Sequence, residues 1–228
     1  MDTPAVLAHG ISVQGTEGTV YGPLDIEIPT TGLIVLAGRG GSGRTALALT
    51  LSGRMKPSSG TLTVLGETKP ANIRPKVAIA GVAVIDELDR DVTIKAILRE
   101  HRAWSTKWAF WTPRIDPQYY EQLCKPIFGD RPLPPMSAYI SQIPALDRIL
   151  LRIALAMNPA HKTPIEMLVM DDLEQVREEP DRQQLIDTLA RLSQTIPVVV
   201  NAVNPLPGYP HINLHTDGAY IRSAKEQQ

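Results

Sequence analysis

The sequence predicts an α/β fold, because strand-like and helix-like segments alternate along the chain and a glycine-rich turn joins a buried strand to an apolar helix. That strand is GLIVLAG (residues 32–38) and that helix is ALALTLSGRM (46–55). Shorter strand-like segments lie at residues 11–14, 24–28 and 61–66. With 228 residues and 43% hydrophobic content, the chain is long enough to bury a substantial core.

The turn between that strand and helix reads GRGGSGRT (residues 38–45). It fits the phosphate-binding P-loop pattern GxxxxGK[ST] at every defined position except the lysine, which is Arg44. Backbone N–H groups of such a turn converge on phosphate oxygens, and the helix N-terminus behind them adds partial positive charge. We therefore predict a nucleotide-binding loop; the alternative is a glycine-rich turn that binds nothing. Its residues are Gly38, Arg39, Gly40, Gly41, Ser42, Gly43, Arg44 and Thr45.

Two residues of this loop have separate chemical roles. Arg44 keeps the positive charge of the lysine but presents it on a wider, planar group, so we expect it to hold phosphate without placing a point charge where a reaction needs one. Thr45 keeps the hydroxyl that coordinates magnesium in such loops.

Composition restricts the other classes of function. The net charge of −1 argues against a protein that coats nucleic acid, so no nucleic-acid partner is expected. The sequence contains no run of about 18 apolar residues, the length that spans a bilayer. Its N-terminus also lacks the basic and apolar segments of a secretory signal. The single cysteine, Cys124, allows no internal disulfide, which is typical of a reducing compartment.

The order of these segments resembles the nucleotide-binding domain of ABC (ATP-binding cassette) transporters. The most specific part is the P-loop, its helix and the following turn and strand, KPSSGTLTVLG (residues 56–66). The resemblance covers nearly the whole chain and implies a P-loop NTPase of the ABC-ATPase type. Its expected parts are a mixed-sheet core, an antiparallel β subdomain and a helical subdomain. We expect one domain over residues 1–228, with the helical subdomain inserted at about 91–150.

The resemblance also implies roles for two carboxylates. MLVMDD (residues 167–172) is similar to the Walker B strand of the family, so Asp171 is expected to orient magnesium and Asp172 to be the general base. Asp172 stands where the family has glutamate, and its carboxylate lies one methylene nearer the backbone. The alternative is an acidic strand end that caps a helix. The charged run that follows, residues 173–184, is expected to be a solvated turn and helix start.

Two switch motifs of the family are altered in this chain. Asp86 and Glu87 follow a predicted strand at residues 81–85, where the family has the Q-loop glutamine. Asn201 and Ala202 follow the strand at residues 196–200, where the family has the H-loop histidine.

The signature motif and the adenine-stacking residue also differ from the family pattern. In the signature LSGGQ the serine is retained as Ser141, but Gln142, Ile143 and Pro144 follow it. The side chains of Gln142 and Ile143 are expected to obstruct the approach of backbone N–H groups to a nucleotide on a facing subunit. Tyr21 is a weak substitute for the aromatic residue that stacks on adenine.

The resemblance implies an ATP-binding subunit that binds ATP and Mg²⁺ and pairs with a membrane permease subunit. It is expected to form a homodimer, or a heterodimer with another nucleotide-binding subunit, and to be cytoplasmic and peripheral on the inner face of the cell membrane. The altered motifs predict hydrolysis that is weak or partner-dependent, since each missing donor or base costs about 10²-fold in rate. One alternative is a soluble nucleotide-responsive binding or scaffold protein derived from an ABC ATPase, without transport. Another is a P-loop kinase or NTPase outside the family.

A permease would be expected to dock on the helical subdomain. Trp104, Trp108 and Trp111 recur there at the spacing of one helical stripe. Such a stripe fits either a docking surface or, as aromatic helix faces usually do, the protein core.

Overall fold

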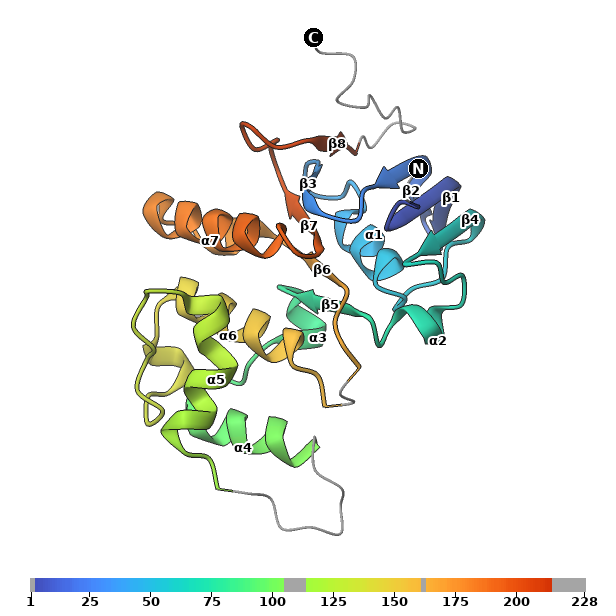
Figure 1. The fold of residues 1–228 in the computed structure, drawn as a ribbon. Helices are drawn as coiled ribbons and strands as arrows, with labels where there is room; N and C mark the ends of the chain where they lie inside the picture. Colours follow the sequence, from blue (N-terminus) through green and yellow to red (C-terminus); the bar gives the residue numbers. More distant parts are fainter. Residues whose placement is uncertain (1–2, 105–113, 161–162, 215–228) are drawn as a thin grey trace.

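The computed structural model describes residues 3–104, 114–160 and 163–214, whose strands form two sheets (Figure 1). An antiparallel sheet of order β2-β1-β4 contains β1 (Val6–Gly15), β2 (Gly18–Ile28) and β4 (Ser59–Val64). A second sheet of order β5-β6-β7-β3-β8 contains β3 (Gly32–Ala37), β5 (Val77–Ala80), β6 (Met167–Met170), β7 (Pro197–Ala202) and β8 (His211–Asn213). The strand pairs of the second sheet are parallel, whereas a mixed sheet was expected.

The helices lie around these sheets. They are α1 (Arg44–Leu51), α2 (Pro70–Ile73), α3 (Ala83–Asp86), α4 (Ile94–Trp104), α5 (Pro117–Phe128), α6 (Ala145–Met157) and α7 (Glu179–Leu192), with 3₁₀ turns η1 (Ile140–Gln142) and η2 (Leu173–Gln175). Figure 1 shows α4, α5 and α6 grouped on one side of the parallel sheet and the antiparallel sheet on the other.

The parallel sheet is buried on both faces because its strands are almost entirely apolar. Side chains alternate along β3: Leu33 and Val35 pack with α4 to α7, and Ile34 and Leu36 pack with α1 and the antiparallel sheet. The two hydrophobic clusters thus lie on opposite faces of one sheet. This packing fixes the positions of the loops that follow its strands.

Two predicted segments differ from the structure, and a glycine accounts for each. The strand predicted at residues 81–85 is wrong: β5 ends at Ala80, and α3 begins at Ala83. Gly81 has a φ of 88°, and a Cβ there would lie 2.1 Å from the carbonyl oxygen of Asp171, so the chain turns out of the sheet at this point. The helix predicted to extend to residue 55 ends at Leu51, because Gly53 turns the chain with a φ of 67°.

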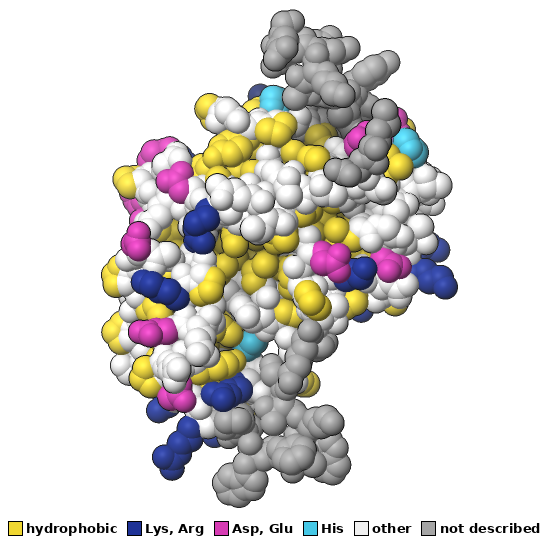
Figure 2. Space-filling model, viewed as in Figure 1, with side chains coloured by type: hydrophobic (Ala, Val, Ile, Leu, Met, Phe, Trp, Pro, Cys, Tyr) yellow, Lys and Arg dark blue, Asp and Glu magenta, His cyan; other side chains and the backbone are white. Residues whose placement is uncertain are grey.

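The surface carries charges of both signs. On the face drawn in Figure 2, acidic and basic side chains are interspersed, in keeping with the net charge of −1. Trp104 is 74% exposed at the end of α4, so the core interpretation is wrong for this residue, while Trp108 and Trp111 lie outside the described residues. Within the described ranges, each helix is too short or too polar to traverse a bilayer.

Candidate functional site

The carboxyl ends of β3, β6 and β7 meet at one edge of the parallel sheet, since parallel strands all run in the same direction. Ligands of open α/β sheets bind outside such an edge. Here the P-loop (residues 38–45) follows β3, Asp171 follows β6, and Asn201 lies near the end of β7. The Thr45 hydroxyl donates to Asp171 Oδ2 at 2.7 Å, and Asn201 Nδ2 donates to Asp171 Oδ1 at 2.5 Å. The fold therefore brings the two predicted magnesium ligands together and adds Asn201.

Glycine determines how the P-loop enters α1. Gly43 precedes the helix with a φ of 78°, and a Cβ there would lie 2.4 Å from the carbonyl oxygen of Val20 on β2. The first turn of α1 contains no acidic side chain, so its partial positive charge is available to an anion. Among the other predicted loop residues, Arg39, Gly40 and Gly41 are exposed, whereas Gly38 and Ser42 are buried.

Four buried polar atoms at this edge have no hydrogen-bond partner among the described residues: Ser42 Oγ, Arg44 Nη1, Glu174 Oε2 and Asn201 Oδ1. Buried polar atoms in native proteins nearly always have a partner, so such a cluster indicates where a ligand completes the bonding. The Ser42 hydroxyl and the Arg44 guanidinium are donors that suit phosphate oxygens. The residues present therefore fit the phosphates of a nucleotide.

The donor set also fits Mg²⁺. This ion usually binds through one or two carboxylates together with phosphate oxygens and water, rather than through a cage of protein ligands. In the described part of the chain there is no group of three or more His, Cys, Asp and Glu side chains arranged to hold a metal. The Thr45 hydroxyl and the Asp171 carboxylate, already hydrogen-bonded to each other, are the oxygen pair expected for magnesium held with a nucleotide.

Asp172, the predicted base, lies half-buried beside the P-loop arginine. It has a φ of 57°, a left-handed conformation that aspartate tolerates better than most residues. Burial raises the pKa of the Asp172 carboxyl, as do the neighbouring carboxylates of Glu174 and Asp171, while Arg44 lowers it. The electrostatics of this carboxyl thus depend on Glu174, a residue that the sequence did not assign to the site.

The expectation that residues 173–184 form only a solvated turn and helix start is wrong for η2. Glu174 Oε2 lies 3.7 Å from Arg44 Nη1, and Glu174 Oε1 accepts a 2.6 Å hydrogen bond from the backbone N–H of Val203, just after β7. The buried Leu173 fixes η2 against the core. The available sequence signal was this apolar residue between two acidic ones, two positions after Asp171.

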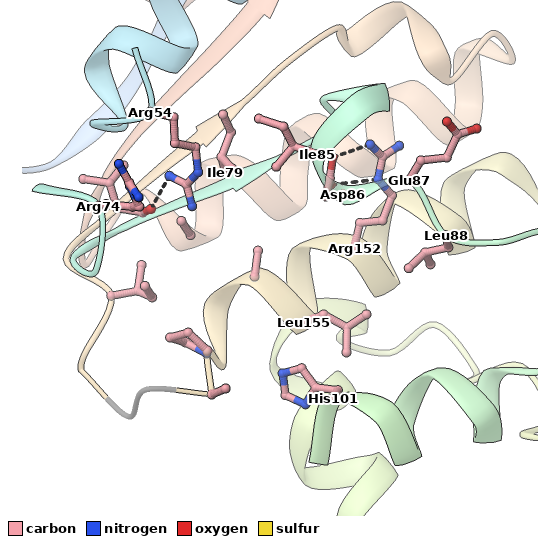
Figure 3. Close-up of a pocket in the computed structure, with 16 residues that line it drawn as sticks. Arg54, Arg74, Ile79, Ile85, Asp86, Glu87, Leu88, His101, Arg152 and Leu155 are labelled. Carbon is pink, nitrogen blue, oxygen red and sulfur yellow. Dashed lines mark hydrogen bonds and ion pairs between the residues drawn. The ribbon is translucent and has the colours of Figure 1, made fainter. Parts of the chain in front are cut away.

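A second charged cluster lies near the ends of β5 and β6. It contains Asp86, Arg152, Gln175 and the backbone of Gly81, and we call it the Asp86 network; Figure 3 draws its ion pair between Asp86 and Arg152. Arg152 on α6 donates from Nε to Asp86 Oδ2 at 2.8 Å and from Nη2 to Asp86 Oδ1 at 2.5 Å. Its Nη1 donates to Gln175 Oε1, and Gln175 Nε2 donates to the carbonyl oxygen of Gly81. The N–H of Gly81 donates to Asp86 Oδ2, which completes the network. The residue at the Q-loop position is therefore fixed to α6.

The chain matches two curated export proteins over part of its length. Cytochrome c biogenesis ATP-binding export protein CcmA of Agrobacterium fabrum is 26% identical over 92 residues, which cover 40% of this chain and 43% of that protein. Nod factor export ATP-binding protein I of Ralstonia nicotianae is 31% identical over 98 residues, which cover 42% of this chain and 30% of that protein. The chain thus matches less than half the length of either relative. No protein-family model matches it.

Solved structures match nearly the whole chain. CbiO1 of Clostridium perfringens, part of the ABC transporter complex CbiONQ, covers 97% of this chain, and the chain covers 89% of CbiO1, with a TM-score of 0.72 at 11% identity. The chain has the fold of an ABC transporter nucleotide-binding domain. The resemblance stated from the sequence is confirmed, and so is the ABC-ATPase type of the fold.

Within this ABC-type fold, the altered signature differs from expectation in one respect. Ile143 is buried, and the Gln142 side chain accepts a hydrogen bond from the N–H of Tyr139. The expectation that the Ile143 side chain obstructs a facing nucleotide is therefore wrong. Pro144 precedes α6 and supplies no N–H donor there.

Tyr21 has a structural role in this ABC-type fold. It is 3% exposed, and its hydroxyl donates to Thr50 Oγ1 on α1 at 2.8 Å. Burial raises the pKa of the Tyr21 hydroxyl, in keeping with its enclosed position. Tyr21 is therefore unavailable to stack on a base.

Proposed function

We propose that the chain is the ATP-binding subunit of an ABC-type transporter and binds magnesium-nucleotide through its variant P-loop. The observation that supports this most strongly is the cluster of unpartnered buried atoms beside the Thr45–Asp171 pair. It lies at the sheet edge where α/β proteins bind ligands. The ABC-type fold and the two ATP-binding relatives agree with the proposal.

Different residues at this edge of the sheet would bind the phosphates and the magnesium ion. Arg44 and the N–H groups of residues 38–45 would bind phosphate oxygens, and Thr45 and Asp171 would hold Mg²⁺. Magnesium, when bound, would neutralise part of the phosphate charge. Asn201 keeps the Asp171 carboxylate in a fixed orientation by donating to Oδ1, the role of an outer-shell partner of a metal ligand.

Hydrolysis by this subunit is proposed to be weak or dependent on a partner. Asp172 is the candidate base, but its carboxylate is one methylene shorter than the glutamate of the family and shares its surroundings with Glu174. Asn201 and Ala202 stand at the position of the H-loop histidine. Losing a base or a donor of this kind costs about 10²-fold or more in rate, and such losses are not additive.

A membrane permease subunit is the proposed partner, with a homodimer or heterodimer of nucleotide-binding subunits on the cytoplasmic face of the membrane. The chain is proposed to be one domain, with the helical subdomain at about residues 91–150. Ile85 and Trp104 expose apolar side chains on α3 and α4. Between α3, α4 and α6 lies the pocket of about 390 Å³ drawn in Figure 3, one wall of which contains Asp86 and Arg152.

The second candidate is a soluble nucleotide-responsive scaffold that keeps the fold without transport. The Asp86 network favours it, because a bidentate ion pair between Asp86 and the buried Arg152 attaches α6 to the sheet core. Co-purification of the chain with a membrane protein would favour the transporter subunit. A monodisperse complex with soluble proteins only would favour the scaffold.

Calorimetry with Mg-ATP tests nucleotide binding at the P-loop, which both candidate functions require. We expect binding in the micromolar to low-millimolar range that weakens about tenfold or more in Arg44→Ala, since the arginine is the main charge offered to phosphate. Arg39→Ala, which removes an exposed arginine of the same loop, is the matched control and should change affinity about threefold or less. Equal effects of the two variants, or no binding by the unaltered protein, would contradict the proposed phosphate site.

A further inference from the structure

Arg44, the residue that replaces the P-loop lysine, lies beside a carboxylate of the same chain. Glu174 Oε2 is 3.7 Å from Arg44 Nη1, and the Arg44 side chain is only 14% exposed. This distance is short enough for an ion pair but too long for a hydrogen bond. Both atoms are also buried without a hydrogen-bond partner among the described residues. The pair therefore attracts by charge while leaving the hydrogen-bonding capacity of both atoms unused.

Glu174 is held in this position by its surroundings. Its Oε1 accepts from the N–H of Val203, which follows β7, and Leu173 anchors η2 in the core. The carboxylate thus spans from the segment after β7 to the first turn of α1. The Val203 N–H holds the carboxylate and the buried Leu173 holds the backbone, so Glu174 stays near Arg44 without a hydrogen bond to it.

Carboxylates outnumber the arginine at this site. Asp171, Asp172 and Glu174 all lie at this edge; the charges of Asp171, Glu174 and Arg44 act on Asp172, and Glu174 is paired with Arg44. Three carboxylates against one buried arginine disfavour the approach of a free nucleotide. Magnesium bound with the nucleotide would offset part of that repulsion.

We propose that Glu174 is a positioning residue that holds Arg44 in the nucleotide-free protein and lowers its affinity for phosphate. A nucleotide then enters by exchange, in which a phosphate replaces Glu174 as the partner of Arg44. The proposal rests on the proposed function in one respect, namely that phosphate binds at the P-loop. It adds that the affinity of the loop is set by a residue outside it.

The experiment measures Mg-ATP binding by calorimetry for the full chain and for Glu174→Gln. Glutamine keeps an oxygen acceptor for the Val203 N–H but removes the charge. We expect Glu174→Gln to bind Mg-ATP about tenfold more tightly than the unaltered protein. Glu178→Gln, an equal charge change at an exposed position of the same segment, is the matched control and should stay within about twofold.

The direction of the change in Mg-ATP affinity distinguishes a positioning role of Glu174 from distortion of the site by the substitution, because a distorted site loses affinity and does not gain it. Equal or weaker binding by Glu174→Gln, while the unaltered protein binds, overturns the proposal and leaves the proposed function standing. Absence of binding by all three proteins overturns the proposed function and the exchange with it.

A double variant tests whether Glu174 acts through Arg44. In the Arg44→Ala background, Glu174→Gln is expected to raise affinity by about threefold or less, because the partner that Glu174 holds is gone. An undiminished tenfold gain in that background would mean that Glu174 repels phosphate directly, which contradicts its role as a positioning residue.

Discussion

Two charged clusters lie at the same edge of the parallel sheet and differ in how completely their atoms are bonded. In the Asp86 network, all three guanidinium nitrogens of Arg152 and both carboxylate oxygens of Asp86 have partners. At the P-loop, Ser42, Arg44 and Asn201 each keep a buried atom without a partner among the described residues. A closed network stabilises the fold, whereas an incomplete one fits a site that a ligand completes.

The two clusters are neighbours in space and share a link. Gln175 donates both to the carbonyl oxygen of Gly81, in the Asp86 network, and to the carbonyl oxygen of Asp171, beside the P-loop, at 2.7 and 3.2 Å. Proximity alone therefore does not explain the difference. If the comparison is correct, substitutions in the first cluster reduce stability, and substitutions in the second reduce binding.

The largest loss of stability is expected for Arg152→Ala. Removing one partner of a buried ion pair leaves Asp86 with an uncompensated charge, which costs about 3–5 kcal/mol of unfolding free energy. Denaturant unfolding measures this loss, and Mg-ATP affinity of the remaining folded protein should change about twofold or less. Arg148→Ala on the same helix, which removes a hydrogen bond to the Ile143 carbonyl oxygen, should cost only about 1 kcal/mol.

The double variant Asp86→Ala with Arg152→Ala sharpens this prediction. Removing both charges together should cost less than the sum of the two single substitutions, since no charge remains buried alone. Strictly additive losses would show that the pair contributes little to the network.

An intermediate loss is expected for Asn201→Ala. This fully buried side chain donates to Asp171 Oδ1, and removing it leaves that oxygen without its donor, at a cost of about 1 kcal/mol. Thermal unfolding without nucleotide measures the cost, and Mg-ATP should protect the variant less than it protects the unaltered protein. A loss as large as that of Arg152→Ala would remove the distinction between the two clusters.

The smallest effect on stability is expected for Thr45→Val. Thr45 is exposed, but its hydroxyl donates to Asp171 Oδ2 at 2.7 Å, so the nucleotide-free protein should lose about 0.5–1 kcal/mol. Affinity for ATP in the presence of Mg²⁺ should nevertheless fall about tenfold, because the hydroxyl proposed to ligate the metal is absent. Thr45→Ser keeps the hydroxyl and serves as the control. Loss of affinity that is the same with and without Mg²⁺ would argue against Thr45 as a magnesium ligand.

The sequence by itself predicted the α/β class, the strand, loop and helix around residues 38–45, and the acidic strand end at Asp171. These features are encoded by local spacing: glycines permit the turn, a continuous run of apolar residues defines the strand, and a hydroxyl residue ends the loop. The fold type followed from the order of such segments. The nucleotide-binding roles of these residues remain predictions.

Only the tertiary structure decided which side chains complete the site. Thr45 and Asp171 are 126 positions apart, Asp86 and Arg152 are 66 apart, and Glu174 reaches Arg44 only because η2 packs against the core. Such contacts depend on which strands become neighbours and where each strand ends, and sheet packing sets both. No local pattern specifies that arrangement, which is why a glutamate in a charged run proved to face the P-loop arginine.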